Sequence, residues 1–244
     1  MRSSPSKLRQ FGPDPLEPGP AGFAHRGRHG PGVPENSLTA FETAIDCGAG
    51  IECDVRLSSD GEVVVFHDHD LRHLCEVALI TEETPAALLM GQRLLDTGER
   101  IPRLFDLLEL VHGRVPLLIE LKTCRNARRL TEAVAANLAR YDGPVGVMSF
   151  DPRVARVAKQ SFPELRRGLV IRAGQPTWKR WLALRLADPH FLAVDRQALG
   201  QSWVERARRR MPVYSWTISS DVQRRQAEVH VGALIWEADG RPRD

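Results

Sequence analysis

Three short clusters hold the side chains that could do chemistry: His25-Arg26-Gly27, Glu52-Cys53-Asp54 and His67-Asp68. Glu52 and Asp54 are two residues apart, so on a β-strand their carboxylates face the same side. Carboxylate oxygens suit a hard divalent cation such as Mg²⁺ or Ca²⁺. His25 and His67 can each carry a proton near neutral pH. This combination is typical of metal-assisted cleavage of a phosphodiester.

A fourth cluster extends this set. The apolar run Pro116–Ile119 leads into Glu120 and Lys122, which are separated by one residue. A run this apolar does not fit an outer face, so both side chains are expected to share an inward face. There Glu120 would be a third carboxylate for the cation, and the Lys122 ammonium could hold a phosphate oxygen. A salt-bridged strand end is the simpler alternative.

The two histidines are informative as a pair. Cleavage of a P–O bond needs a base for the attacking oxygen and an acid for the departing one, and each contributes about 10²–10⁴-fold. A lone histidine is more often a core or loop residue, and a lone Glu-x-Asp pair is more often a solvated strand face. Together with Arg26, whose guanidinium can bind two phosphoryl oxygens at once, they favour phosphodiester chemistry.

Each cluster lies at the end of an apolar, strand-like run, and such runs alternate with amphipathic stretches almost to the C-terminus. This alternation is typical of repeated β-α units. The expected strands are Gly22–His25, Gly50–Leu57, Glu62–His67, Val115–Leu121, Val145–Phe150, Gly168–Ile171, Phe191–Val194, Val213–Thr217 and Ala233–Trp236. Nine strands are one more than a (β/α)₈ barrel contains.

The segment Ser58–Gly61 accounts for the extra strand, because it is too short for a parallel crossover and predicts a β-hairpin. A two-residue turn at Asp60-Gly61 would place Asp54 opposite His67, and a four-residue loop would place Glu52 opposite His67. The remaining eight strands can close. The sequence therefore predicts an α/β fold, a TIM-type (β/α)₈ barrel with an extra β-hairpin arm after strand 2.

Amphipathic helices are predicted between the strands. They cover Ser37–Cys47, Leu104–Val111, Ala127–Leu138, Val154–Ser161, Trp178–Leu186, Trp203–Arg210 and Asp221–Glu228. Asn36 or Ser37 is the expected N-cap of the first. Trp178 and Trp181 share one helical face, and we expect them to pack on the barrel or line its mouth. Because loops at the carboxyl ends of barrel strands normally build the active site, the polar clusters are expected to meet there.

The 244 residues are enough for one large domain. We expect a flexible, Pro/Gly-rich leader over residues 1–20 and a single barrel domain over residues 21–244. The 34 basic and 31 acidic residues give a formal charge of only +3, which predicts no nucleic-acid partner.

The first twenty residues contain no signal-peptide-like apolar core, and no run of about 18 apolar residues occurs anywhere. The sequence thus predicts a cytoplasmic protein with no transmembrane segment, and it leaves the oligomeric state open. The four cysteines have no C-x-x-C spacing, which favours free thiols over disulfides or a zinc site.

The motifs also follow one another in a recognisable order. They are His25-Arg26-Gly27, Pro34-Glu35-Asn36-Ser37 with Ala40-Phe41, Glu52-x-Asp54-Val55, Val65-Phe66-His67-Asp68, Ile101-Pro102, Ile119-Glu120-Leu121-Lys122, Ser149-Phe150 and Trp216-Thr217. This series resembles that of the glycerophosphodiester phosphodiesterases, in the phospholipase C-like phosphodiesterase superfamily of TIM barrels. The resemblance runs from about Phe23 to Trp216 and rests on order and spacing.

The resemblance implies a metal-dependent phosphoric diester hydrolase that converts a glycerophosphodiester into an alcohol and sn-glycerol 3-phosphate. By position in the motifs, it implies that His25 is the proton acceptor and His67 the proton donor. It further implies that Glu52, Asp54 and Glu120 bind one Mg²⁺ or Ca²⁺ ion.

The same resemblance implies roles for four residues that would contact the substrate. Arg26 and Lys122 are implied phosphate contacts, and Phe150 and Trp216 are implied apolar walls around the glycerol. The expected route is attack by the substrate's own glycerol hydroxyl through a cyclic glycerol phosphate, since intramolecular attack has a proximity advantage.

Two segments depart from the family pattern, so the leaving-group side of the site stays open. Residues 231–242 lack the usual Thr-Asp pair, and residues 72–87 lack the common Arg-x-Thr-x-Asn run. Two alternative functions follow. Lysophospholipase D-type activity would need an apolar groove for an acyl chain. A catalytically silent protein that binds phosphate-containing metabolites would not need two proton carriers.

Overall fold

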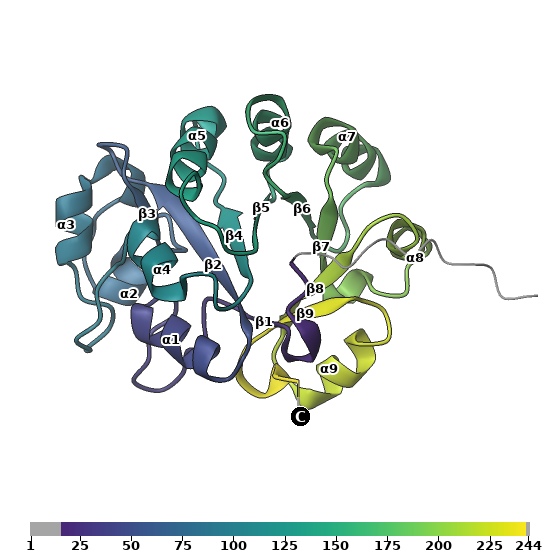
Figure 1. The fold of residues 1–244 in the computed structure, drawn as a ribbon, viewed down its shortest axis with the longest axis horizontal. Helices are drawn as coiled ribbons and strands as arrows, with labels where there is room; N and C mark the ends of the chain where they lie inside the picture. Colours follow the sequence, from purple (N-terminus) through teal and green to yellow (C-terminus); the bar gives the residue numbers. More distant parts are fainter. Residues whose placement is uncertain (1–15, 243–244) are drawn as a thin grey trace, which may run out of the picture.

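The computed structural model of the protein describes residues 16–242 (Figure 1). The strands are β1 Phe23–Ala24, β2 Gly50–Leu57, β3 Val63–Val65, β4 Leu117–Leu121, β5 Val145–Ser149, β6 Arg167–Ile171, β7 Phe191–Asp195, β8 Val213–Ile218 and β9 Ala233–Trp236. The α-helices are α1 Leu38–Asp46, α2 Arg72–Cys75, α3 Ala86–Gly91, α4 Leu104–Val111, α5 Ala127–Leu138, α6 Pro152–Ser161, α7 Thr177–Ala187, α8 Ser202–Arg208 and α9 Asp221–Ala227.

Eight of the strands form a closed parallel barrel. Their order is β1-β9-β8-β7-β6-β5-β4-β2, and β1 also pairs with β2, which completes the ring. Figure 1 shows the helices arranged around the outside of the strands. The predicted TIM-type barrel is confirmed, as is the first helix, whose N-cap Ser37 accepts a hydrogen bond from the Ala40 N–H.

The ninth strand, β3, lies outside the ring and pairs antiparallel with the end of β2. The predicted hairpin is therefore confirmed, but both predicted registers are wrong, because Val55 pairs with Val65 and Asp54 lies opposite Phe66. The Ser58 N–H donates to the Glu62 carbonyl across a three-residue loop, in which Gly61 has φ +96°. A glycine at positive φ closes such loops without steric cost.

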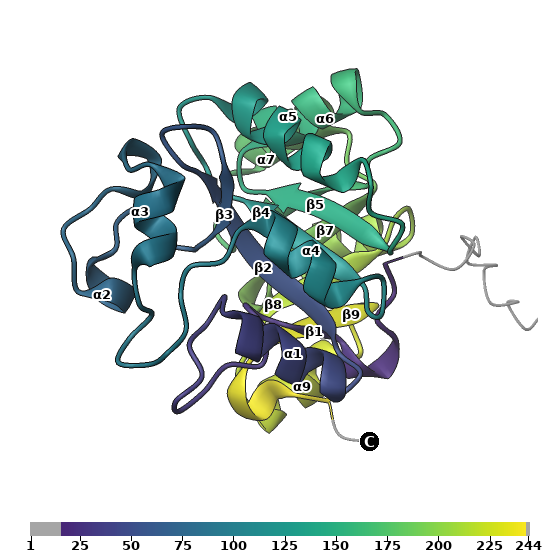
Figure 2. The same cartoon turned by 60° about the vertical axis from the view of Figure 1, so that its left-hand side comes forward.

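The hairpin continues into an arm larger than the sequence indicated. Residues 63–103 contain β3, α2, α3 and a small separate core that includes Val64, Phe66, Leu89 and Ile101. Figure 2 shows α2 and α3 standing to one side of the barrel. The arm includes residues 72–87, where the sequence departs from the family pattern.

The barrel interior is filled by aromatic and aliphatic side chains, among them Phe23, Phe191 and Tyr214. Gly168 makes room for this layer, since a Cβ there would lie 2.2 Å from the Phe191 ring. Leu16 is also fully buried in this layer. Most of the predicted flexible leader, residues 1–15, lies outside the described residues, so the leader and the domain boundary stay predictions.

Between residues 16 and 242, no helix has the length and apolar character needed to cross a membrane. The four cysteines, all within this range, are free, and Cys53 is buried in the layer between strands and helices.

Candidate active site

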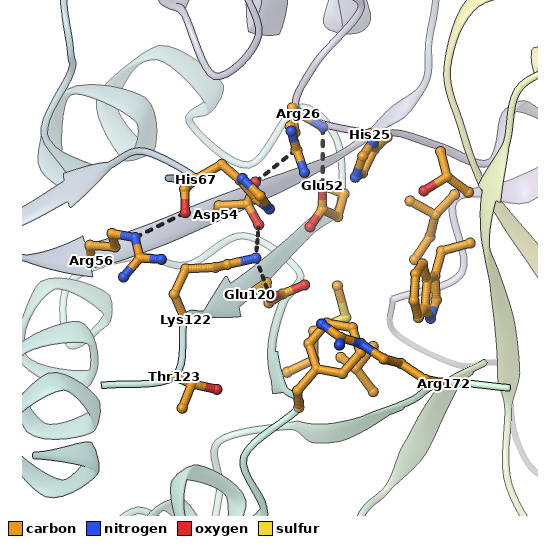
Figure 3. Close-up of a pocket in the computed structure, with 16 residues that line it drawn as sticks. His25, Arg26, Glu52, Asp54, Arg56, His67, Glu120, Lys122, Thr123 and Arg172 are labelled. Carbon is orange, nitrogen blue, oxygen red and sulfur yellow. Dashed lines mark hydrogen bonds and ion pairs between the residues drawn. The ribbon is translucent and has the colours of Figure 1, made fainter. Parts of the chain in front are cut away.

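The polar clusters meet in one pocket of about 500 Å³. Its lining includes all nine residues singled out from the sequence: His25, Arg26, Glu52, Asp54, His67, Glu120, Lys122, Phe150 and Trp216. The first two follow β1, the carboxylates lie on β2 and β4, and His67 follows β3. Figure 3 shows His25 and His67 with Glu52 and Asp54 between them. The geometry thus supports one reaction centre built from distant parts of the chain.

Three carboxylates form the floor of the pocket. Ligand oxygens of Glu52, Asp54 and Glu120 all lie within 4.8 Å of one another, and all three residues are buried. The parallel register places Asp54 beside Glu120 on adjacent strands. A cluster of hard oxygen donors this compact suits Mg²⁺ or Ca²⁺. A second possible donor set, His25, His29 and Glu237, is richer in nitrogen and shares the candidate base.

Two cations stand beside these carboxylates. Lys122 Nζ lies 2.6 Å from Glu120 Oε1 and 3.2 Å from Asp54 Oδ1. Arg26 Nε lies 3.0 Å from Asp54 Oδ2, at an angle outside that of a hydrogen bond, and the same guanidinium donates to Glu35 Oε1 at 2.8 Å. Both cations could therefore reach a phosphate group held above the carboxylates.

The backbone at Arg26 is set by an unusual conformation. Arg26 has φ +55°, and its N–H donates to Glu52 Oε2 at 3.1 Å. Gly27 follows with φ +77°, where a Cβ would lie 2.8 Å from the Ala40 backbone. Only glycine fits here, because a side chain would clash with Ala40 and the positive φ is unfavourable for other residues. This turn directs the Arg26 side chain and backbone toward the same pair of carboxylates.

Asn36 fixes the position of Asp54. Its Nδ2 donates to Asp54 Oδ2 at 3.1 Å, and its Oδ1 accepts from the Asp54 N–H at 3.2 Å. Both residues are buried, and unpaired groups there would be costly. Asn36 therefore holds one orientation of this carboxylate. Its role was not predicted, although it stands within a motif that the sequence analysis quoted.

Burial and neighbouring charges shift the pKa values of the three carboxyl groups in different directions. Burial and the neighbouring Asp54 charge raise the pKa of Glu52 to about 8. Burial would also raise the pKa of Asp54, but Lys122 and Arg26 outweigh it and hold that pKa below its usual value. Burial and Asp54 raise the pKa of Glu120. Like charges held this close ionise together only if a further positive charge joins them, so the donor set fits a divalent cation.

This arrangement predicts that the chelator-treated protein loses stability as pH rises from about 4.5 to about 8. The unfolded chain releases the Glu52 proton near pH 4.5, whereas the folded chain keeps it until about pH 8. Ionisation therefore stabilises the unfolded state over this range, and each unit of pKa difference lowers the free energy of unfolding by about 1.4 kcal/mol. Thermal melts in EDTA across this range measure the effect.

The isosteric variant Glu52→Gln is the control for those melts, because it removes the Glu52 titration and keeps the shape of the side chain. Its melting temperature is expected to fall less with pH than that of the wild type. An equal pH dependence in the two proteins would contradict the raised pKa.

Each histidine is held by a carboxylate. His25 Nδ1 lies 2.9 Å from Glu237 Oε2, and His67 Nδ1 lies 2.6 Å from Asp68 Oδ1. Burial alone would lower the pKa of His25, but Glu237 and Glu52 outweigh it and raise that pKa. Burial lowers the pKa of His67, although Asp54 opposes this. Without a cation, these shifts favour a protonated His25 and a neutral His67, the reverse of the base and acid roles that the family resemblance implies. A divalent cation at the carboxylates would lower the pKa of His25 by charge repulsion.

Glu237 is a functional candidate that the sequence analysis missed. It belongs to the divergent segment 231–242, in which the sequence showed only that the usual Thr-Asp pair is missing. Glu237 follows β9, the strand that pairs with β1, and the backbone N–H of His25 donates to the Trp236 carbonyl. The only available signal was that an acidic residue follows the last strand.

The opposite wall of the pocket is apolar and aromatic. The Phe150 and Trp216 rings meet edge to face, with their centroids 5.4 Å apart. Trp216 Nε1 donates to the Ala193 carbonyl, which fixes the indole. The Arg172 guanidinium lies 4.6 Å from the centroid of Phe150 and also lines the pocket. Sequence reasoning predicted the two aromatic residues here and missed Arg172.

The comparisons with known proteins agree with this geometry. The model of the glycerophosphoryl diester phosphodiesterase family matches residues 25–240. The glycerophosphodiester phosphodiesterase of Caldanaerobacter subterraneus subsp. tengcongensis is 31% identical over 191 residues, 72% of each chain.

Solved structures give the same family. An Oleispira antarctica phosphodiesterase, in complex with the product sn-glycerol-3-phosphate, has a TM-score of 0.78 at 25% identity and covers 90% of this chain and 92% of its own. A Thermotoga maritima glycerophosphodiester phosphodiesterase has a TM-score of 0.73 at 27% identity, over 88% and 92% of the two chains. On this family match and these relatives, the chain belongs to the glycerophosphoryl diester phosphodiesterase family.

Proposed function

We propose that the protein hydrolyses glycerophosphodiesters to an alcohol and sn-glycerol 3-phosphate with the help of one divalent cation. The observation that carries the proposal is the pair His25 and His67 on either side of one buried carboxylate cluster. A pocket that only bound a phosphate would need its cations and no pair of proton carriers. The Oleispira relative holds sn-glycerol-3-phosphate, which fits this product.

The carboxylates Glu52, Asp54 and Glu120 would hold the cation. Bound there, Mg²⁺ or Ca²⁺ would supply positive charge that stabilises the phosphoryl oxygens in the transition state. Arg26 and Lys122 would bind the same phosphoryl oxygens, because their cationic groups already border the carboxylates.

The proton transfers fall to the histidines. His25 accepts the proton of the neighbouring glycerol hydroxyl, and that oxygen attacks phosphorus to form a cyclic glycerol phosphate. His67 donates a proton to the alcohol oxygen as its bond to phosphorus breaks. Water then opens the ring with the two roles reversed, which restores both histidines. Phe150 and Trp216 would enclose the carbon atoms of the glycerol.

The deciding experiment measures glycerol 3-phosphate release from a panel of glycerophosphodiesters, with EDTA and with added Mg²⁺ or Ca²⁺. Release that requires a divalent cation supports the proposal. Release from lysophospholipids alone would favour the lysophospholipase D alternative. No release from any substrate with any cation would favour the silent binding protein.

Glu237 is expected to act through His25, and Glu237→Gln tests this. Because Glu237 raises the pKa of His25, its loss should lower that pKa. His25 would then be neutral at lower pH, so the acidic limb of the kcat/KM profile should move toward lower pH. The maximal rate should also fall by about tenfold or more, because a neutral amide stabilises the imidazolium less.

Glu237→Asp is the conservative control and should restore part of the rate and the wild-type pH limb. A uniform fall in rate with no movement of the limb would show that Glu237 is only structural.

A further inference from the structure

Helix α7 carries bulky apolar side chains on its outer surface. Trp178, Trp181 and Leu182 have exposed fractions of 64%, 57% and 44%. They are spaced i, i+3 and i+4, so they share one face of the helix. The expectation that the two tryptophans pack on the barrel or line its mouth is wrong, because they are exposed and lie outside the pocket lining.

Folding does not explain this face. On the side of α7 that packs on the barrel, Ala183 and Ala187 are buried and Leu184 is partly buried. Trp178, Trp181 and Leu182 instead expose apolar surface to water, which is unfavourable for a monomer. The other exposed large apolar residues lie apart from one another in sequence, as Leu88 and Phe105 do.

The same helix is strongly basic. It contains Lys179, Arg180 and Arg185 and no acidic residue. The Lys179 ammonium lies 5.4 Å from the Trp178 ring, and the Arg185 guanidinium lies 5.0 Å from the Trp181 ring. Neither cation forms an ion pair with a residue in the described range 16–242. Exposed aromatic groups thus alternate with unpaired positive charge.

The position of α7 relates this face to the pocket. Strand β6 ends at Ile171, Arg172 lines the pocket, and α7 begins five residues later at Thr177. Trp178 is therefore in the first turn of the helix, at the carboxyl-end rim of the barrel where the pocket opens. Figure 1 shows α7 on the periphery of the molecule.

We propose that the outer face of α7, made of Trp178, Lys179, Trp181, Leu182 and Arg185, is a docking surface for anionic phospholipid bilayers. Tryptophan favours the boundary between lipid headgroups and acyl chains, and basic side chains are drawn to anionic lipid. A second copy of the chain is a poorer occupant. A twofold contact would set the basic residues of this face against themselves.

Vesicle sedimentation tests the proposal with the full chain. The wild type is expected to bind vesicles of phosphatidylglycerol and phosphatidylcholine in equal parts, to bind pure phosphatidylcholine far less, and to be released by high salt. The double variants W178A/W181A and K179E/R185E should each lower the partition coefficient about tenfold or more. Indole fluorescence of the wild type should shift to the blue on binding.

The matched control is L88A/F105A, which removes two side chains of similar exposure, 56% and 49%, from α3 and α4. It should bind vesicles like the wild type. The melting temperature should stay close to that of the wild type in all these variants, which shows that they fold. Because binding is measured without turnover, the test stands apart from the proposed function.

Three outcomes would overturn the proposal. The first is a wild type that does not bind anionic vesicles at low salt. The second is an equal loss of binding in L88A/F105A. The third is a dimeric wild type that becomes monomeric in W178A/W181A, since a second copy would then be the occupant of this face.

Discussion

Replacing His67 with Asn is expected to lower kcat/KM for glycerophosphocholine by about 10²–10⁴-fold, the usual contribution of a positioned general acid. His67 Nδ1 lies 2.6 Å from Asp68, so its other nitrogen is free to donate to the leaving oxygen. Burial lowers the pKa of His67, so its protonated form is a stronger acid but is less populated at neutral pH, and the activity of the wild type should fall as pH rises. The side chain is partly exposed, so its loss should leave the melting temperature nearly unchanged.

Two substrates with different leaving groups distinguish the proton donor from the proton acceptor. A glycerophosphodiester of p-nitrophenol releases an anion that needs no proton, so His67→Asn should lose far less activity on it. His25→Asn should lose similar activity on both substrates, because the attacking hydroxyl is the same. An equal loss on both substrates in His67→Asn would contradict its role as proton donor.

Replacing Glu52 with Gln is expected to lower metal-supported turnover by about 10²-fold or more, since a lost cation removes several kcal/mol of charge stabilisation. The amide keeps the shape of the side chain but is a weaker ligand than a carboxylate. In EDTA, where no cation is bound, the same substitution should stabilise the fold. Near pH 8 Glu52→Gln should be more stable than the wild type in EDTA, because the variant has no carboxylate to ionise in this buried place beside Asp54.

Lower turnover with metal together with higher stability in EDTA would distinguish a cation site from a cluster that is only structural. Added Mg²⁺ or Ca²⁺ should raise the melting temperature of the wild type and change that of Glu52→Gln much less. Glu42→Gln is the matched control, because Glu42 is exposed on α1. It should leave turnover and the metal response unchanged. A Glu52→Gln protein with normal turnover would contradict the assignment.

The hairpin shows how far local sequence reasoning reaches. The short segment after β2 predicted an antiparallel pair correctly, because four residues cannot span a parallel crossover. The register depended on one residue of loop length. The observed three-residue loop places Phe66, and neither proton carrier, opposite Asp54. His67 reaches the pocket because the chain turns after β3, where the Arg56 side chain donates to its carbonyl.

The tryptophans of α7 show a different limit. Their spacing predicted a shared face correctly, since periodicity depends only on the helix. Whether that face is turned inward depends on what the barrel offers as a partner, and here Ala183 and Ala187 pack inward instead. Periodicity alone shows which side chains share a helix face, but it does not show whether that face is turned toward the barrel or toward solvent.

The sequence by itself determined the barrel, the hairpin and the nine pocket residues that follow its motifs. These follow from patterns along the chain: alternation of apolar runs, two-residue spacing on strands, and the order of motifs. The tertiary structure alone decided the partners that come from elsewhere, such as Glu237, which meets His25 across 212 positions of sequence. Closing β9 against β1 brings that carboxylate to the base, and the pairing of side chains across this seam depends on the register of the closed ring, which no local pattern encodes.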